Sequence, residues 1–312
     1  MQQEILFLEP VFTHNIWGGT KLRTEFCYDI DGDDIGECWG IAAHEHGDCH
    51  IRSGIYKGMT LSELWENHPK LFGQSGEGKF PLLVKILDAK DDLSVQVHPD
   101  DVYAKKNENG SYGKAECWYI LECDENATLV LGHHAKSNEE LCEMVNGAKW
   151  KKLIREVPVK KGDFIQLNPG TMHAIKGGIM LLETQQNSDI TYRVYDYDRM
   201  SNGKLRELHV EKSLDVIEVP ATDAEKMITS ALEVPKNQFY ELINCQYYKV
   251  YKIDVQGEFE YCLKVPFLLM SVIEGTGKIN EYPIKKNDHF IVPYGIKNIK
   301  LSGNVKMIAS TI

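Results

Sequence analysis

Basic residues are scarce in this sequence relative to acidic ones. There are 35 lysines and arginines against 46 aspartates and glutamates, which gives a formal net charge of −11. A general nucleic-acid surface needs a positive field, so we expect no nucleic-acid partner. A small anionic ligand is still compatible with this charge, because a few local cations can hold one phosphate group.

The sequence also lacks long apolar runs and the pattern of a secretory signal. No stretch of about 18 apolar residues occurs, so we expect no segment that crosses a membrane. The opening segment MQQEILFLEP has two glutamates and no basic residue, whereas a secretory signal begins with positive charge. We therefore predict a cytoplasmic protein.

Paired cysteines are missing as well. The eight cysteines are scattered along the chain, and no two of them form a CxxC motif. In a chain of 312 residues this pattern is typical of reduced thiols in the cytosol rather than of a disulfide framework. A zinc site made of cysteines is not expected either.

Short strand patterns dominate what is present. Apolar or alternating segments, most of them bounded by Gly, Pro or Asp, occur at PLLVKILDA (81–89), LSVQVHP (93–99), CWYILEC (117–123) and GIMLLETQ (178–185). Similar segments continue to the C-terminus. Many short strands separated by turns are typical of barrels or sandwiches rather than of βαβ folds.

Helical patterns are fewer and predict a small helical annex on a β body. We expect three helices, at about 60–73, 137–147 and 205–217. The first two begin with a capping-box spacing, in which Thr60 is followed by Glu63 and Ser137 by Glu140.

One segment of the sequence is repeated. VPVKKGDFIQLNPGTMHAI (157–175) resembles YPIKKNDHFIVPYGIKNI (282–299), with two lysines, an aspartate, strand residues and a turn in the same order. Such a repeat indicates one structural unit used twice. The second copy has Asn298 where the first has His173. We therefore predict a mainly β fold of two β-barrel (jelly-roll) units, with the boundary near residue 235.

Three segments carry side chains suited to a metal ion. Gln96 and His98 are two residues apart, so on a strand they point to the same face; a half-exposed polar strand is the alternative. Glu116 opens an apolar strand, where its carboxylate needs a cation, either a metal or the nearby Lys114. His173 follows a Pro-Gly turn and completes the set. Such oxygen and nitrogen donors suit Zn²⁺, Fe²⁺ or Mn²⁺.

A fourth segment, LLETQQNSDITYRVYDYDR (181–199), carries further charges. Glu183 ends an apolar strand, where a carboxylate without a role would be costly. Arg193 and Arg199 are flanked by tyrosines, a setting suited to guanidinium groups that hold a phosphate. The alternative is a solvated polar loop after a strand.

Taken together, these segments resemble a known family, the type I mannose-6-phosphate isomerases in their short bacterial form. The resemblance covers most of residues 1–200 and rests on an ordered series of motifs. The series is HNIWGGTKL (14–22), IGECWGIAAH (35–44), PLLVKILDA, LSVQVHPDD, GKAECWYIL (113–121), NPGTMHAI and ETQQNSDITYR. It implies two cupin-like units: a catalytic, metal-binding unit over 1–235 that includes the helices, and a unit over 236–312 without metal ligands.

The resemblance also implies the site residues. One zinc ion per chain would be bound by Gln96, His98, Glu116 and His173. The catalytic residues would be Lys114, Glu183 and Arg193. Substrate would be bound by Trp17, Glu37, Lys85, Ser94 and Asp189, with Arg199 as a further phosphate candidate. Larger members of the family have a lysine in place of Arg199.

The implied reaction interconverts mannose 6-phosphate and fructose 6-phosphate through an enediol. Glu183 and Lys114 are rival candidates for the base that removes the proton. Two other functions fit a metal site of this kind, a metal-dependent cupin oxygenase and a non-catalytic sugar-binding cupin; a structural zinc site is a third alternative. We expect a monomer whose ligand is a small sugar phosphate.

Overall fold

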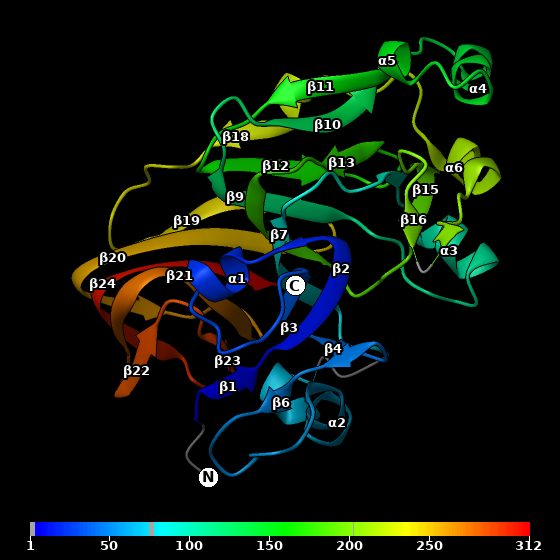
Figure 1. The fold of residues 1–312 in the computed structure, drawn as a ribbon. Helices are drawn as coiled ribbons and strands as arrows, with labels where there is room; N and C mark the ends of the chain where they lie inside the picture. Colours follow the sequence, from blue (N-terminus) through cyan, green and yellow to red (C-terminus); the bar gives the residue numbers. More distant parts are fainter. Residues whose placement is uncertain (1–3, 75–77, 202) are drawn as a thin grey trace.

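The computed structural model describes residues 4–74, 78–201 and 203–312. The chain is mainly β, with its short helices at the outside of the sheets (Figure 1). The predicted cupin-like architecture is confirmed, but the described strands form open sheets with free edges rather than closed barrels.

The first unit is built from two antiparallel sheets that face each other. The seven-stranded sheet has the order β18 (Ile228–Ser230), β12 (Asp163–Leu167), β9 (Glu116–Cys123), β14 (Ile179–Gln186), β7 (Leu82–Ala89), β2 (Val11–Gly19) and β3 (Ile35–Ile41). The five-stranded sheet has the order β11 (Ile154–Pro158), β10 (Thr128–His133), β13 (His173–Ile175), β8 (Val95–Val97) and β15 (Tyr192–Tyr195).

Apolar side chains from the inner faces of these two sheets form a common core. Trp118 of β9 belongs to the same buried cluster as Leu131 of β10 and Ile175 of β13. The central strands β7 and β14 are buried along their whole length. Because both of their faces are covered, their sequences are nearly continuous apolar runs, and the few charges within them lie inside the protein.

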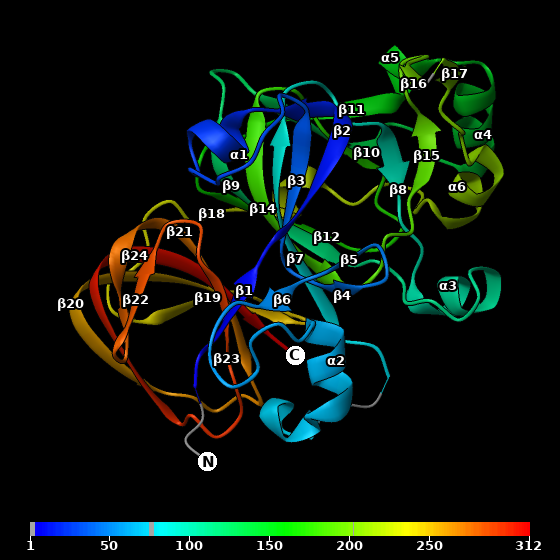
Figure 2. The same cartoon turned by 60° about the horizontal axis from the view of Figure 1, so that its bottom comes forward.

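The second unit is one strongly curved eight-stranded sheet (Figure 2). Its order is β19 (Phe239–Asn244), β20 (Lys249–Cys262), β24 (Asn298–Thr311), β21 (Leu268–Ile279), β23 (His289–Val292), β1 (Leu6–Glu9) and β6 (His50–Ile51), with β22 (Tyr282–Lys285) paired to β21. Two strands from the beginning of the chain, β1 and β6, therefore complete the sheet of the second unit. The boundary near residue 235 stays a prediction, and the strand pairing crosses it.

The helices agree with the sequence pattern at their capped starts. α2 (Leu61–Asn67) begins after Thr60 with the full capping box, and α4 (Asn138–Asn146) begins after Ser137, whose hydroxyl accepts from the Glu140 amide. The third predicted helix is shorter than expected, since α6 spans only Val210–Val216. The helix expected at 60–73 is divided into α2 and a 3-10 turn, η1 (Pro69–Phe72). The sequence pattern did not predict the other short helices: α1 (Lys21–Thr24), α3 (Asp101–Asn107), α5 (Trp150–Leu153) and η2 (Ala224–Lys226).

The two units are joined by buried contacts. Trp65 of α2 and Phe72 at the end of Pro69–Phe72 pack edge-on against Phe267, which precedes β21 of the second unit. A hydrogen-bonded chain also crosses the joint: the Tyr28 hydroxyl lies 2.7 Å from Nε2 of His289, and Nδ1 of His289 lies 2.8 Å from the Ser271 hydroxyl. The interface is thus both apolar and hydrogen-bonded.

Two expectations about the whole chain can be compared with the structure. None of the described helices is both long and apolar enough to span a membrane. All eight cysteines lie in the described ranges and are free thiols, as the scattered spacing predicts.

Candidate metal centre and active site

Four side chains from three strands of the first unit converge between its sheets. Gln96 on β8 lies directly opposite His173 on β13, and His98 follows β8 immediately. Glu116 opens β9 on the facing sheet, where its Oε1 lies 3.2 Å from Nε2 of His173 and its Oε2 lies 3.5 Å from Nε2 of His98. The Gln96 amide lies 3.3 Å from Nε2 of His173. The predicted metal set is therefore assembled in one place.

The protons of this cluster point away from its centre. Nδ1 of His98 is 2.7 Å from the Ile190 carbonyl, and Nδ1 of His173 is 2.9 Å from the Thr171 carbonyl. Each neutral ring therefore keeps its proton on Nδ1 and turns the lone pair of Nε2 towards Glu116. Burial lowers the pKa of His173 to about 4 and holds the pKa of His98 well below its usual range, so both rings are neutral.

The inner atoms of this cluster are mainly acceptors: the Nε2 atoms of two neutral imidazoles and the carboxylate oxygens of Glu116. Oε1 of Glu116 is buried and accepts no hydrogen bond from the described residues. Two imidazole lone pairs and a carboxylate that face one another repel unless a cation lies between them. Turning over the Gln96 amide would add an oxygen to the set. The donor atoms therefore fit a divalent metal ion, and His98, Glu116 and His173 are close enough to share one.

Lys114 is the second cation partner that the sequence analysis considered for Glu116. Its Nζ lies 2.6 Å from Oε2 of Glu116, 3.2 Å from Nε2 of His98 and 3.9 Å from Oε1 of Glu183. Burial disfavours the charged form of Lys114, but Glu116 and Glu183 outweigh it and raise the pKa of this ammonium above its usual range. Oε2 of Glu116 is thus paired with Lys114, while Oε1 faces the imidazole of His173.

A cavity of about 190 Å³ lies beside this cluster. Most of the predicted catalytic and substrate residues line it: Trp17, Glu37, Lys85, Ser94, Lys114, Glu183, Asp189 and Arg193. The predicted metal ligand Gln96 lines it as well. The predicted phosphate candidate Arg199 does not. Its guanidinium instead donates to the Asp196 carboxylate and the Asp92 carbonyl.

Residues that the sequence analysis did not single out complete the lining. They include Asn15, Trp39, Thr191 and Arg206. Asn15 and Trp39 had a signal in the sequence, since each is two positions from a predicted residue on the same strand. No sequence signal marked Arg206 as a lining residue. It lies in a loop ahead of α6, within a segment that we predicted as helix.

Carboxylates and ammonium groups alternate along one wall of the cavity. Nζ of Lys85 lies 3.4 Å from Glu37 and 3.9 Å from Glu183, and it stands 4.6 Å from the centre of the Trp39 ring. Glu183 also accepts a 2.9 Å hydrogen bond from the Trp118 indole. Burial raises the pKa of Glu183 despite its two lysine neighbours. This carboxylate is therefore held in a fixed position with an increased affinity for a proton.

The opposite side of the cavity carries positive charge with little compensation. Arg193 lies opposite Gln96 in the β8–β15 pairing, and its buried Nε has no acceptor among the described residues. Arg206 is close enough that Arg193 contributes to lowering its pKa, after the larger effect of burial. Arg206 has one ion pair, 3.2 Å from Asp196. Two neighbouring guanidinium groups facing a small cavity suit a phosphate ligand.

The chain is similar to a family of known enzymes along its whole length. Residues 5–129 match the family described as phosphomannose isomerase type I, catalytic domain, and residues 238–312 match mannose-6-phosphate isomerase, cupin domain. Mannose-6-phosphate isomerase ManA of Bacillus subtilis is 50% identical over 99% of both chains. Mannose-6-phosphate isomerase of Streptococcus mutans is 45% identical over 98% of both.

Solved structures agree with this similarity. The crystal structure of the mannose 6-phosphate isomerase from Bacillus subtilis superimposes with a TM-score of 0.94 and 47% identity, covering 99% of this chain and 100% of that one. A mutant of phosphomannose isomerase from Salmonella typhimurium has a TM-score of 0.80 at 15% identity, over 99% of both chains. At that identity the match concerns the fold alone.

Proposed function

Because the chain belongs to the type I phosphomannose isomerase family, we propose that it interconverts mannose 6-phosphate and fructose 6-phosphate using one bound zinc ion. One observation carries the proposal: a set of metal donors adjoins a cavity that also holds a buried carboxylate and two neighbouring guanidinium groups. Together these features can polarise a carbonyl group, remove a proton from the adjacent carbon and bind a phosphate.

The metal would be held by Gln96, His98, Glu116 and His173. Two neutral imidazoles, a carboxylate and an amide oxygen suit Zn²⁺, and the chain supplies no cysteine to this site. When bound, the ion supplies Lewis acidity that stabilises negative charge on the substrate's carbonyl oxygen. The Nδ1 hydrogen bonds of His98 and His173 keep both rings oriented for this task.

The proton transfers fall to residues of the cavity wall. The open-chain aldose loses a proton from C2, passes through an enediol and regains a proton at C1. We assign the base to Glu183, because its burial raises the pKa of the carboxyl towards neutrality, where a general base works best. We assign Lys114 to the charge that develops on the oxygens, because its neighbours favour the ammonium form. The contacts of the two side chains thus favour Glu183 over its rival.

The remaining lining residues would bind the substrate. We assign the phosphate to Ser94 and Arg206, with Arg193 between the phosphate and the reacting carbons. Arg206 takes the place that the sequence analysis gave to Arg199, because Arg199 is engaged elsewhere. Trp17, Glu37 and Asp189 would contact the sugar, with Lys85 holding Glu37 and Glu183 in place. Binding energy at the phosphate would orient the reacting end.

A coupled assay of fructose 6-phosphate formation, with parallel elemental analysis, tests this proposal. We expect turnover of mannose 6-phosphate, one zinc per chain, loss of turnover on chelation and recovery on adding zinc back. Binding of the sugar phosphate without turnover would instead favour a non-catalytic sugar-binding cupin. Active iron together with O₂ uptake would favour a cupin oxygenase. Full activity in metal-free protein would remove the metal from the mechanism.

The proposal extends to where and how the enzyme acts. A phosphorylated sugar is a metabolite of the cell interior, and the eight free thiols suit a reducing compartment, so we expect it to work in the cytoplasm. We keep the prediction of a monomer, which light scattering at micromolar concentration would test.

A further inference from the structure

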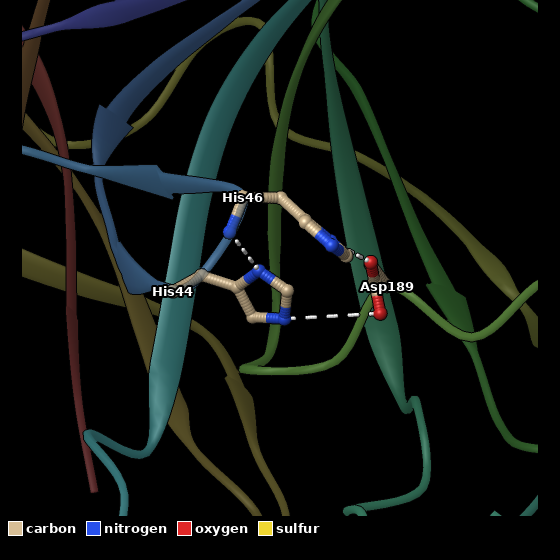
Figure 3. Close-up of side chains that lie close together, drawn as sticks. All are labelled: His44, His46 and Asp189. Carbon is tan, nitrogen blue, oxygen red and sulfur yellow. Dashed lines mark hydrogen bonds and ion pairs between the residues drawn. The ribbon is translucent and has the colours of Figure 1, made fainter.

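A second group of two histidines and a carboxylate lies at the edge of the cavity. It is carried by the hairpin of β4 (Ala43–His44) and β5 (Gly47–Asp48) and by the loop after β14 (Figure 3). Nδ1 of His46 is 2.6 Å from Oδ2 of Asp189, and Nε2 of His44 is 3.7 Å from Oδ1 of the same carboxylate. Asp189 is also part of the cavity lining.

The group has the composition of a metal site, but its His44 ring carries the proton on the opposite nitrogen from the rings of His98 and His173. The backbone N–H of His46 donates to Nδ1 of His44 across 3.2 Å. A neutral His44 must therefore carry its own proton on Nε2, the nitrogen that faces Asp189. In the main cluster both Nδ1 atoms face carbonyls, which leaves Nε2 free for a metal. Here the same residue types form a clamp on Asp189, in which His46 is hydrogen-bonded to the carboxylate and His44 makes a longer contact.

Charges around the clamp keep the carboxylate ionised. Burial opposes the charged form of Asp189, but the hydrogen bond from His46 and the nearby His44 outweigh it, so its pKa lies below the usual range. Burial lowers the pKa of His44, which is thus neutral at neutral pH; Glu45 and Lys79 act on it in opposite directions. An ionised Asp189 can accept hydrogen bonds from hydroxyl groups.

The loop that carries Asp189 is anchored on both sides of it. The Asn187 amide donates to the Ala43 carbonyl across 2.9 Å, which fastens the loop to the same hairpin. One residue after Asp189, the Ile190 carbonyl accepts from His98 of the metal cluster. With the backbone fixed in this way, the His46 side chain decides the direction of the Asp189 carboxylate.

We propose that His46 is a positioning residue, which with His44 directs the Asp189 carboxylate towards the sugar hydroxyls of the substrate. The inference rests on the proposed function and adds a determinant of substrate affinity outside the cavity wall. His46 itself is mostly exposed, with a side chain that is 65% accessible, so replacing it does not disturb the core.

The test compares His46→Leu with His46→Asn, since the Asn side-chain amide can place an N–H near the position of Nδ1. For His46→Leu we expect KM for mannose 6-phosphate to rise about five- to tenfold with kcat within about twofold, as for loss of uniform binding. His46→Asn should restore KM to within about twofold of wild type. The matched control is His134→Leu at another exposed histidine, which should leave both constants unchanged.

Three results would overturn the inference. They are an unchanged KM in His46→Leu, an equal loss in His46→Asn, and a second zinc per chain that disappears in His46→Leu. If the wild-type protein binds mannose 6-phosphate without turning it over, the proposed function fails. In that case the Kd for mannose 6-phosphate is measured by calorimetry, and we expect it to show the same fold-changes as those given above for KM. Equal Kd values for wild type and His46→Leu would then reject the proposed role of His46.

Discussion

The two units of this chain use the same turn but fill their interiors differently. Lys160 N–H donates to the carboxylate of Asp163 across 3.0 Å, and in the second unit Lys285 N–H donates to Asp288 across 2.8 Å. Both turns contain a residue with positive φ, 86° at Gly162 and 78° at Asn287. Both aspartates are almost fully buried. The sequence repeat is thus a structural repeat.

The first unit holds a cluster of buried charged side chains between its two sheets. The interior of the second unit is mostly apolar and includes Met270, Phe290 and Met307. At the position of His173, the second unit has Asn298, which is exposed at the start of β24. The comparison indicates that the chemistry depends on a few inward-facing side chains. The strands and turns that the two units share form with or without those side chains.

The largest expected effect comes from making the first unit like the second. His173→Asn copies the residue of the second unit into the metal cluster and removes one imidazole donor. We expect the zinc content to fall well below one per chain and turnover to drop at least about 1,000-fold, because Lewis-acid stabilisation contributes several kcal/mol. Elemental analysis and the coupled assay measure both quantities.

The matched control changes the corresponding residue of the other unit. Asn298→Ala should leave zinc content and turnover unchanged, since its side chain is exposed and belongs to β24 of the second unit. Near-normal zinc content and turnover in His173→Asn would show that His173 is not needed for metal binding, and the proposed difference between the two units at this position would be wrong.

The next effect concerns the buried carboxylate of the cavity. Glu183→Gln should lower kcat about 100- to 1,000-fold at unchanged zinc content, because general-base catalysis contributes about this much. The control in the second unit is Glu274→Gln, whose carboxylate pairs with Lys306 at the surface and should not affect kcat. If Glu183→Gln keeps its turnover while Lys114→Met loses it, the base is Lys114.

A pH effect should also arise from a buried histidine of the second unit. His289 stands where the first unit has Phe164, and burial lowers the pKa of His289 to about 3. Below about pH 6.5 the unfolded chain takes up a proton on this ring and the folded chain does not, so the free energy of unfolding falls as the pH falls. By pH 5 we expect a loss of about 2 kcal/mol from this residue.

Urea unfolding at pH 7 and pH 5 measures this loss. His289→Gln should be less stable at both pH values, because the ring packs against Gly40, but its stability should change less between them. The other histidines contribute equally to both proteins, so the difference belongs to His289. Equal pH dependence of wild type and variant would exclude it as the source.

The smallest effect tests what the units have in common. Asp163→Ala and Asp288→Ala should each reduce the free energy of unfolding by about 1 kcal/mol, the usual contribution of one hydrogen bond. Asp288 also pairs with Arg52 at 3.0 Å, but that guanidinium is half exposed and adds little. Asn at either position should retain most of the stability. Very unequal losses in urea unfolding would show that the two turns are not equivalent.

Much of the site could be predicted because its signals are local. Alternation placed Gln96 beside His98, and the apolar strand around Glu116 marked a carboxylate that needs a cation. The structure shows the pairing of Glu116 with Lys114 through Oε2, while Oε1 faces His173 and leaves metal binding as a prediction. A single sequence could not choose between the two interpretations, because each oxygen of the carboxylate has its own neighbours.

The sequence by itself determined the elements: the strands, the capped starts of two helices, the repeated turn and the types of side chain that reach the interior. These follow from periodicity and from hydrogen bonds between residues a few positions apart. Only the tertiary structure decided that Arg206 rather than Arg199 faces the cavity, and that β1 joins the sheet of the second unit. Such choices depend on strand register and on contacts between residues far apart in the chain, for which no local pattern exists.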